Sequence, residues 1–169
     1  MNPTLAAWNK AEEAAAIAAM LVCCGSTRWA TEMVALRPIG TVQALSETAD
    51  RVWSAMQEPD WLEAFACHPR IGERNTESAR GQSAAWSKQE QSRTSAASEQ
   101  VLAELDEGNR LYAEIFGFTY IVCATGKSAE EMLDILKRRL NSTREEELCE
   151  AAEQQRQIMQ IRLGKWLVE

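Results

Sequence analysis

The chain contains a single histidine, His68, and its cysteines include no CxxC pair. The cysteines are Cys23, Cys24, Cys67, Cys123 and Cys149. An odd number of cysteines without paired spacing indicates neither a disulfide framework nor a zinc site, so we expect reduced thiols. Because the histidine has no partner at HxxxH or HxxE spacing, we also expect no metal cofactor.

The chain also lacks a basic stripe and a long apolar run. Its net charge is −7, and Lys and Arg nowhere form the cluster that a phosphate backbone requires. No apolar run approaches the roughly 20 residues that cross a bilayer, and the first residues lack the basic and then apolar layout of a signal peptide. We therefore expect a cytoplasmic protein with no nucleic-acid or membrane partner.

Helical signals are abundant along the whole sequence. A chain of 169 residues can bury a substantial core, so residues 1–169 are expected to form a single domain. Alanine-rich stretches and apolar residues spaced by three and four favour helices over strands. The sequence predicts an all-α, compact single-domain bundle of about seven to nine helices with no significant sheet.

Capping residues and helix breakers set the expected helix ends. Ser26 has the character of an N-cap, and a polar, glycine-containing loop is expected over residues 70–84. Capping boxes that begin at Ser87, Ser128 and Thr143 are expected to open the last three helices. The predicted helices cover residues 10–24, 27–36, 41–56, 59–67, 87–116, one from 129 and one from 144 to 166.

The stretch FTYIVCAT, residues 118–125, does not have a helical pattern. By itself it is typical of a short strand. Since the sequence offers no second strand to pair with it, we expect an extended buried segment. The backbone N–H and C=O groups of such a segment need partners, and a ligand could supply some of them.

His68 is the natural candidate for proton transfer, because imidazole is the only side chain with an ordinary pKa near neutrality. A lone histidine is more often structural, as a cap or an exposed ring. Here Pro69 fixes the chain direction directly after it and a polar loop follows. That context is typical of a helix end that presents an imidazole to a pocket.

Glu90 and Arg162 each have a structural and a functional interpretation. Glu90 follows Ser87 by three residues, so capping alone would explain it. Arg162 lies four residues after Ile158 and four before Trp166, on or beside the buried stripe of the last helix. A buried arginine needs a carboxylate, either an internal Asp or Glu or an anionic substrate held bidentately. The residues alone therefore indicate a soluble helical domain with a candidate site for a small anion.

Five segments in order carry a family resemblance that runs from about Leu5 to Leu167. They are CGSTRWATEMVALRP, DWLEAFACHPRIGE, SKQEQ, FGFTYIVCATGK and IRLGKWL. With them the chain resembles the 2-oxo-4-hydroxy-4-carboxy-5-ureidoimidazoline (OHCU) decarboxylase family, which makes (S)-allantoin in urate degradation. HPRIGE and FGF, with SxxEQ between them, are specific as a set, although each alone would be weak.

The resemblance implies an all-α fold, usually dimeric, with no metal or organic cofactor and a small anionic ureidoimidazoline substrate. It implies that His68 is the catalytic proton donor and that Glu90 acts beside it. Arg162 would anchor a substrate carboxylate or carbonyl, and the backbone of residues 120–124 would bind the ureido and ring groups. The implied substrate contacts are Pro69, Ser87, Lys88, Gln89, Glu90, Gln91, Tyr120, Ile121, Val122, Cys123, Ala124 and Arg162. Functional coupling to urate oxidase and hydroxyisourate hydrolase is expected.

The implied chemistry is consistent with these residue types. Loss of CO2 leaves an electron pair that a carbonyl or imine next to the reacting carbon can delocalise, so no pyridoxal or thiamine is needed. Glu90 close to His68 would favour the imidazolium form. Two alternatives remain open at this point: an enzyme that acts on a related ureide, such as a hydrolase or racemase, and a catalytically silent helical binding module.

Overall fold

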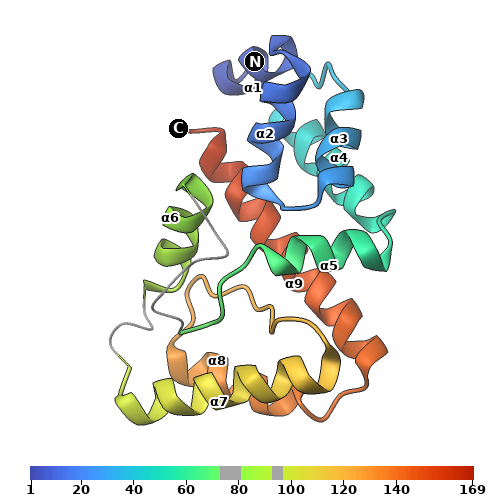
Figure 1. The fold of residues 1–169 in the computed structure, drawn as a ribbon. Helices are drawn as coiled ribbons and strands as arrows, with labels where there is room; N and C mark the ends of the chain where they lie inside the picture. The colour runs from blue at the N-terminus through green and yellow to red at the C-terminus, as the bar shows by residue number, and fades with distance from the viewer. Residues whose placement is uncertain (73–80, 93–96) are drawn as a thin grey trace. The chain divides into compact units, whose positions relative to one another are not determined.

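The computed structural model describes residues 1–72, 81–92 and 97–169. Within these ranges it contains nine α-helices and no β-strand (Figure 1), which confirms the predicted all-α class. The helices are α1 (Pro3–Lys10), α2 (Glu13–Cys23), α3 (Thr27–Ala35), α4 (Val42–Ser54), α5 (Glu58–Ala66), α6 (Gly81–Glu90), α7 (Glu99–Phe116), α8 (Ala129–Arg139) and α9 (Arg144–Trp166).

The chain divides into two compact units. The first comprises Met1–Ala64 and Arg156–Glu169, and the second comprises Phe65–Gln155. Helices α5 and α9 therefore contribute residues to both units. Across the described ranges, none of the helices combines the length and the apolar character that crossing a bilayer requires.

In the first unit, α3 packs against both α2 and α4 (Figure 1). Its core includes Trp29, Met33 and Leu45, all of which are fully buried. The indole N–H of Trp29 donates to the carbonyl oxygen of Ala49 at 3.2 Å. Because this hydrogen bond satisfies the polar atom of the ring, the fully buried Trp29 has no unpaired donor.

In the second unit, α7 runs alongside α8 (Figure 1). Aromatic rings fill the space between α7 and the segment that follows it, with neighbouring ring centroids 4.6 to 6.3 Å apart. These rings belong to Phe65, Tyr112, Phe116, Phe118 and Tyr120. The cluster fixes the chain after Gly117, where φ is +82° and the helix ends.

Several predicted helix starts are confirmed. The hydroxyls of Ser26, Ser128 and Thr143 each accept a hydrogen bond from the N–H three residues later, at 3.2 Å. At Thr143 the capping box is reciprocal, since Glu146 Oε2 accepts from the Thr143 N–H at 2.9 Å. Local side-chain chemistry therefore determines where α3, α8 and α9 begin.

The predicted start at Ser87 is wrong. Ser87 lies inside α6 (Gly81–Glu90), and α7 begins at Glu99, where the hydroxyl of Ser98 accepts from the Val101 N–H at 3.3 Å. The predicted 87–116 helix is therefore two helices, and the predicted loop ends by Gly81. The S-x-x-E pattern misled because it can also occur within a helix, where the serine N–H is already bonded. Residues 73–80 and 93–96 lie outside the described ranges.

The predicted first helix over 10–24 is α2, which begins at Glu13, and a separate helix that was not predicted, α1, precedes it. α1 begins with Pro3, whose fixed φ suits a first turn, and Asn2 Oδ1 accepts from the Leu5 N–H at 3.0 Å. The chain then becomes extended at Ala11, with φ −66° and ψ 151°, before α2 starts at Glu13. The alanine-rich composition gave no sign of this break.

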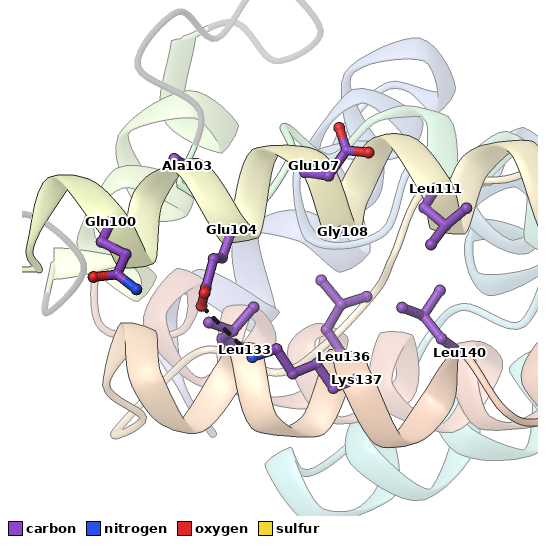
Figure 2. A pocket seen from close by; sticks show the side chains of 10 residues that line it. All are labelled: Gln100, Ala103, Glu104, Glu107, Gly108, Leu111, Leu133, Leu136, Lys137 and Leu140. Carbon is purple, nitrogen blue, oxygen red and sulfur yellow. Dashed lines mark ion pairs between the residues drawn. The ribbon is translucent and has the colours of Figure 1, made fainter.

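An apolar pocket of about 420 Å³ lies between α7 and α8 (Figure 2). Leu111 points from α7 toward α8, and farther along the two helices an ion pair between Glu104 and Lys137, 3.5 Å long, lies next to Leu133 (Figure 2). The lining residues are Gln100, Ala103, Glu104, Glu107, Gly108, Leu111, Leu133, Leu136, Lys137 and Leu140. None of them is a predicted site residue, so the candidate active site lies elsewhere.

Candidate active site

His68 lies just beyond the last turn of α5. Its backbone N–H donates to the carbonyl oxygen of Phe65 at 3.2 Å, and the buried Pro69 that follows has no N–H with which to continue the helix. The His68 side chain is half-buried. The helix thus stops where the sequence predicted and leaves the imidazole at its end.

Two side chains hold the turn that follows Pro69. Gln91 Oε1 accepts from the Gly72 N–H at 3.0 Å, and Asn109 Nδ2 donates to the Ile71 carbonyl at 3.0 Å. Gly72 has φ +83°, a left-handed conformation that favours glycine. The carboxamide oxygen of Gln91 therefore fixes the end of the HPRIG motif.

The imidazole of His68 is hydrogen-bonded to Gln155 of α9. The distance from His68 Nε2 to Gln155 Oε1 is 2.7 Å. Gln155 is fully buried, with an exposed fraction of 0%. Its amide nitrogen has no hydrogen-bond partner in the part of the chain that the structure describes.

The predicted substrate contacts on and after α6 have different exposures. Ser87 is buried, and Glu90 and Gln91 are half-buried. Lys88 and Gln89 are exposed. Residues three and four apart share one side of a helix, so Ser87, Glu90 and Gln91 lie on one side, and Lys88 and Gln89 turn away from it.

Residues 120–124 form a buried segment that belongs to neither helix nor strand. Side chains of the same unit bind three of its backbone groups. Gln154 Oε1 accepts from the Cys123 N–H at 2.8 Å, Lys127 Nζ donates to the Cys123 carbonyl at 2.7 Å, and Arg139 Nη1 donates to the Ile121 carbonyl at 2.6 Å. The predicted burial is confirmed, and these three groups are internally satisfied.

Other backbone groups of this segment have no such partner. Among the described residues, no hydrogen bond is formed by the N–H groups of Tyr120, Ile121, Val122 and Ala124 or by the C=O groups of Tyr120 and Val122. These residues are all at least nine-tenths buried. Buried backbone groups are nearly always paired, so these are the groups in the segment most suited to bind a ligand.

A buried ion pair holds the 120–124 segment in place. Arg139 and Glu147 are paired, and the hydroxyl of Tyr112 donates to Glu147 Oε1 at 2.6 Å. Burial opposes the charge of Arg139, but the hydrogen bond and the negative charge of Glu147 outweigh it and raise the pKa of Arg139. The guanidinium lies 4.9 Å from the ring centroid of Tyr120, and burial raises the pKa of both tyrosines. Arg139 therefore remains charged where it binds the Ile121 carbonyl.

Arg162 belongs to the first unit and is buried, as predicted, with an exposed fraction of 3%. Its Nη1 donates to the Val22 carbonyl at 3.4 Å. Burial raises the pKa of the neighbouring Cys23 thiol to about 12, despite the opposing charge of Arg162. The Cys23 thiol beside this guanidinium therefore stays protonated near neutral pH.

The second unit contains every predicted site residue except Arg162. Sequence reasoning missed Gln154, Gln155, Arg139 and Glu147, which hold the imidazole and the 120–124 segment in place. A signal was present for Gln155, because it is a polar residue three positions before Ile158 on an apolar stripe. Within the described ranges, no group of three or more His, Cys, Asp or Glu is placed to hold a metal ion.

A family match now adds to this geometry. The family model described as OHCU decarboxylase matches residues 9–164. The chain belongs to the OHCU decarboxylase family. The predicted family is thereby confirmed, and the predicted reaction class, a decarboxylation, is the one that the description of this family names.

A curated relative and two solved structures are similar to this family member. The uric acid degradation bifunctional protein TTL of Arabidopsis thaliana is 39% identical over 145 residues, which are 85% of this chain and 45% of that protein. The chain thus spans less than half the length of this relative. A crystal structure of OHCU decarboxylase in the presence of (S)-allantoin has a TM-score of 0.78 at 34% identity and covers 94% of this chain and 100% of that chain.

The second solved structure is more distant in sequence. A crystal structure of (S)-allantoin synthase has a TM-score of 0.68 at 18% identity and covers 96% of this chain and 53% of that chain. At this identity the similarity shows the fold alone.

Proposed function

We propose that this chain decarboxylates OHCU to (S)-allantoin and that His68 donates the proton. The observation that supports this most directly is the half-buried imidazole at the end of α5, fixed by a 2.7 Å hydrogen bond to Gln155. A fixed imidazole is suited to general acid catalysis, because histidine is the side chain whose ordinary pKa lies near neutrality. Membership of the OHCU decarboxylase family supplies the substrate class.

In the proposed reaction, the bond between the ring carbon and its carboxyl group breaks and CO2 leaves. The electron pair stays on the ring carbon and is delocalised into the adjacent carbonyl or imine, so the substrate serves as its own electron sink. The imidazolium of His68 then gives a proton to that carbon and becomes neutral. Delivery to one face sets the (S) configuration, and solvent restores the proton to the imidazole.

The proposed substrate-binding roles follow from where the second unit places these residues. Glu90 and Gln91 would contact the hydroxyl and ureido groups, with Ser87 on the same side of α6. The unpaired backbone groups of Ile121 and Val122 would bind ring or ureido groups of the substrate. Pro69, Tyr120, Cys123 and Ala124 are buried and would shape the pocket, whereas Lys88 and Gln89 are exposed.

Arg162 would bind the substrate carboxylate or a carbonyl. The net charge of −7 disfavours an anionic ligand, so a local cation must dominate the field in the pocket. Arg162 is a buried guanidinium, one nitrogen of which donates to the Val22 carbonyl. A guanidinium is suited to the substrate because its planar fork can bind a carboxylate bidentately.

The test is the stereochemical course of urate breakdown. Urate, urate oxidase and hydroxyisourate hydrolase are mixed with and without this protein, and circular dichroism follows the product. We expect a rapid optically active signal with the wild type and slow racemic decay with His68→Asn, whose folding is checked by far-ultraviolet circular dichroism. A racemic course with the wild type would contradict the proposal, and a product of another mass would identify an enzyme that acts on a related ureide.

The same proposal includes a cytoplasmic homodimer coupled to urate oxidase and hydroxyisourate hydrolase. The resemblance to the OHCU decarboxylase family supports it, because that resemblance implies a dimer and a substrate that those two enzymes supply. Sedimentation equilibrium at the concentration of the assay tests the oligomeric state. A fully active monomer would contradict the homodimer and leave the reaction unaffected.

A further inference from the structure

Within the described residues, only one of the two polar atoms of the Gln155 carboxamide forms a hydrogen bond. Its carboxamide oxygen is 2.7 Å from His68 Nε2, whereas its amide nitrogen has no hydrogen-bond partner within the described ranges. The side chain is fully buried. Since a carboxamide carries two donors and one acceptor oxygen, the donor side is left unsatisfied away from water.

A buried amide with unpaired donors weakens a fold. An apolar side chain of similar size, such as methionine, would fill the same space on α9 without that penalty. Buried polar groups without partners are rare and call for an explanation other than packing. The only hydrogen bond that this side chain forms in the described residues is the one to the imidazole. The imidazole is therefore the group on which Gln155 acts.

We propose that Gln155 is a positioning residue that fixes the tautomer and the rotation of the His68 ring. This proposal rests on the proposed role of His68 as the proton donor. The carboxamide oxygen can only accept, so His68 Nε2 must carry a hydrogen in this arrangement. If Nε2 carried no hydrogen, its lone pair would face a lone pair of Gln155 Oε1 at 2.7 Å, and the two would repel each other.

The tautomer determines which proton takes part in the reaction. When the neutral ring keeps its hydrogen on Nε2, the other ring nitrogen, Nδ1, is the one that gains and loses a proton. The proton given to the substrate carbon then comes from Nδ1 of the imidazolium. The Nε2–H group remains hydrogen-bonded to Gln155 during the whole reaction, and the ring returns to the tautomer from which it started.

The chain offers a direct spectroscopic test, because His68 is its only histidine. Nitrogen-15 imidazole shifts of histidine-labelled protein, measured above the titration range, report the tautomer of this one ring. We expect hydrogen on Nε2 in the wild type and a loss of that preference in Gln155→Met. Hydrogen on Nδ1 in the wild type would overturn the proposal, and this readout does not depend on the reaction.

Gln154→Met is the matched control. Gln154 is the adjacent glutamine on α9, but its oxygen accepts from the Cys123 N–H rather than from the imidazole. The Gln154→Met variant should leave the tautomer of His68 unchanged. An equal change in the two variants would show that the effect spreads through α9 and does not come from the hydrogen bond, which would overturn the proposal.

Kinetics provide the second readout. Gln155→Met should lower kcat on the order of 100-fold with little change in KM, because a small misplacement of a reacting group has an effect of that size. Gln155→Glu keeps an acceptor oxygen and should restore the Nε2–H tautomer. If the wild type is active and Gln155→Met keeps its kcat, the positioning role is wrong.

The two readouts also separate this proposal from the proposed function. If the wild type shows no decarboxylation but has the Nε2–H tautomer, the proposed reaction fails and the control of the ring by Gln155 stands. If Gln155→Met does not fold, the wild-type tautomer and the Gln155→Glu variant still decide the question.

Discussion

Arg139 and Glu147 form an ion pair inside the second unit, with side chains that are 9% and 1% exposed. The same guanidinium donates to the Ile121 carbonyl at 2.6 Å. The pair therefore joins α8 and α9 to the segment whose backbone groups are the proposed substrate contacts.

Removing one partner of this pair should destabilise the protein strongly. Arg139→Met leaves a buried carboxylate without its cation, and such changes cost about 3 to 5 kcal/mol of the free energy of unfolding. Urea denaturation measures the loss. The control is Arg110→Met, because Arg110 pairs with Glu107 and Glu114 on the exposed surface and its removal should change stability little. Equal losses in the two variants would contradict the structural role of the buried pair.

Arg162→Ala should chiefly weaken substrate binding. If the guanidinium binds a substrate anion in both the ground and the transition state, KM rises about tenfold or more while kcat changes little. Arg162→Lys keeps the charge but loses the bidentate geometry, so it should recover only part of the affinity. Steady-state kinetics in the coupled assay measure both variants. A fall in kcat at unchanged KM would contradict the anchoring role.

The stability of the protein should fall at alkaline pH. Burial raises the pKa of Tyr112 and Tyr120 above the ordinary value of 10.0. Above that pH the unfolded chain releases these protons while the folded chain keeps them, so their contribution is complete below pH 10.0 and is lost as the pH rises further. These are the only two tyrosines in the chain. Tyrosinate absorbance therefore reports both, and ionisation near pH 10 in the folded protein would contradict this prediction.

The cysteines should differ in reactivity toward iodoacetamide. Cys67 and Cys149 are exposed, whereas Cys23 is buried and has a pKa raised to about 12. The thiolate is the form that reacts with iodoacetamide. With a pKa of about 12, only about 1 in 10,000 molecules would carry a thiolate at Cys23 at pH 8. Peptide mass spectrometry after brief labelling should find Cys67 and Cys149 modified first. Early modification of Cys23 would show that its side chain is accessible.

Part of the candidate site was readable from single residues. His68 followed by Pro69 marked the end of α5, and the polar Arg162 on an apolar stripe predicted a buried cation. Both depend on local rules, namely the missing N–H of proline and the period of a helix. The Ser87 pattern failed because a capping box is defined by backbone conformation as well as by residue type.

The sequence by itself determined the helical class, most helix ends and the family, because periodicity, caps and motif order act over short distances along the chain. Only the tertiary structure decided which groups meet across it. Gln155 reaches an imidazole 87 residues away, and Arg139 reaches a carbonyl 18 residues away. No local pattern encodes such pairs, because they arise when burial brings distant polar groups together and each must find a partner.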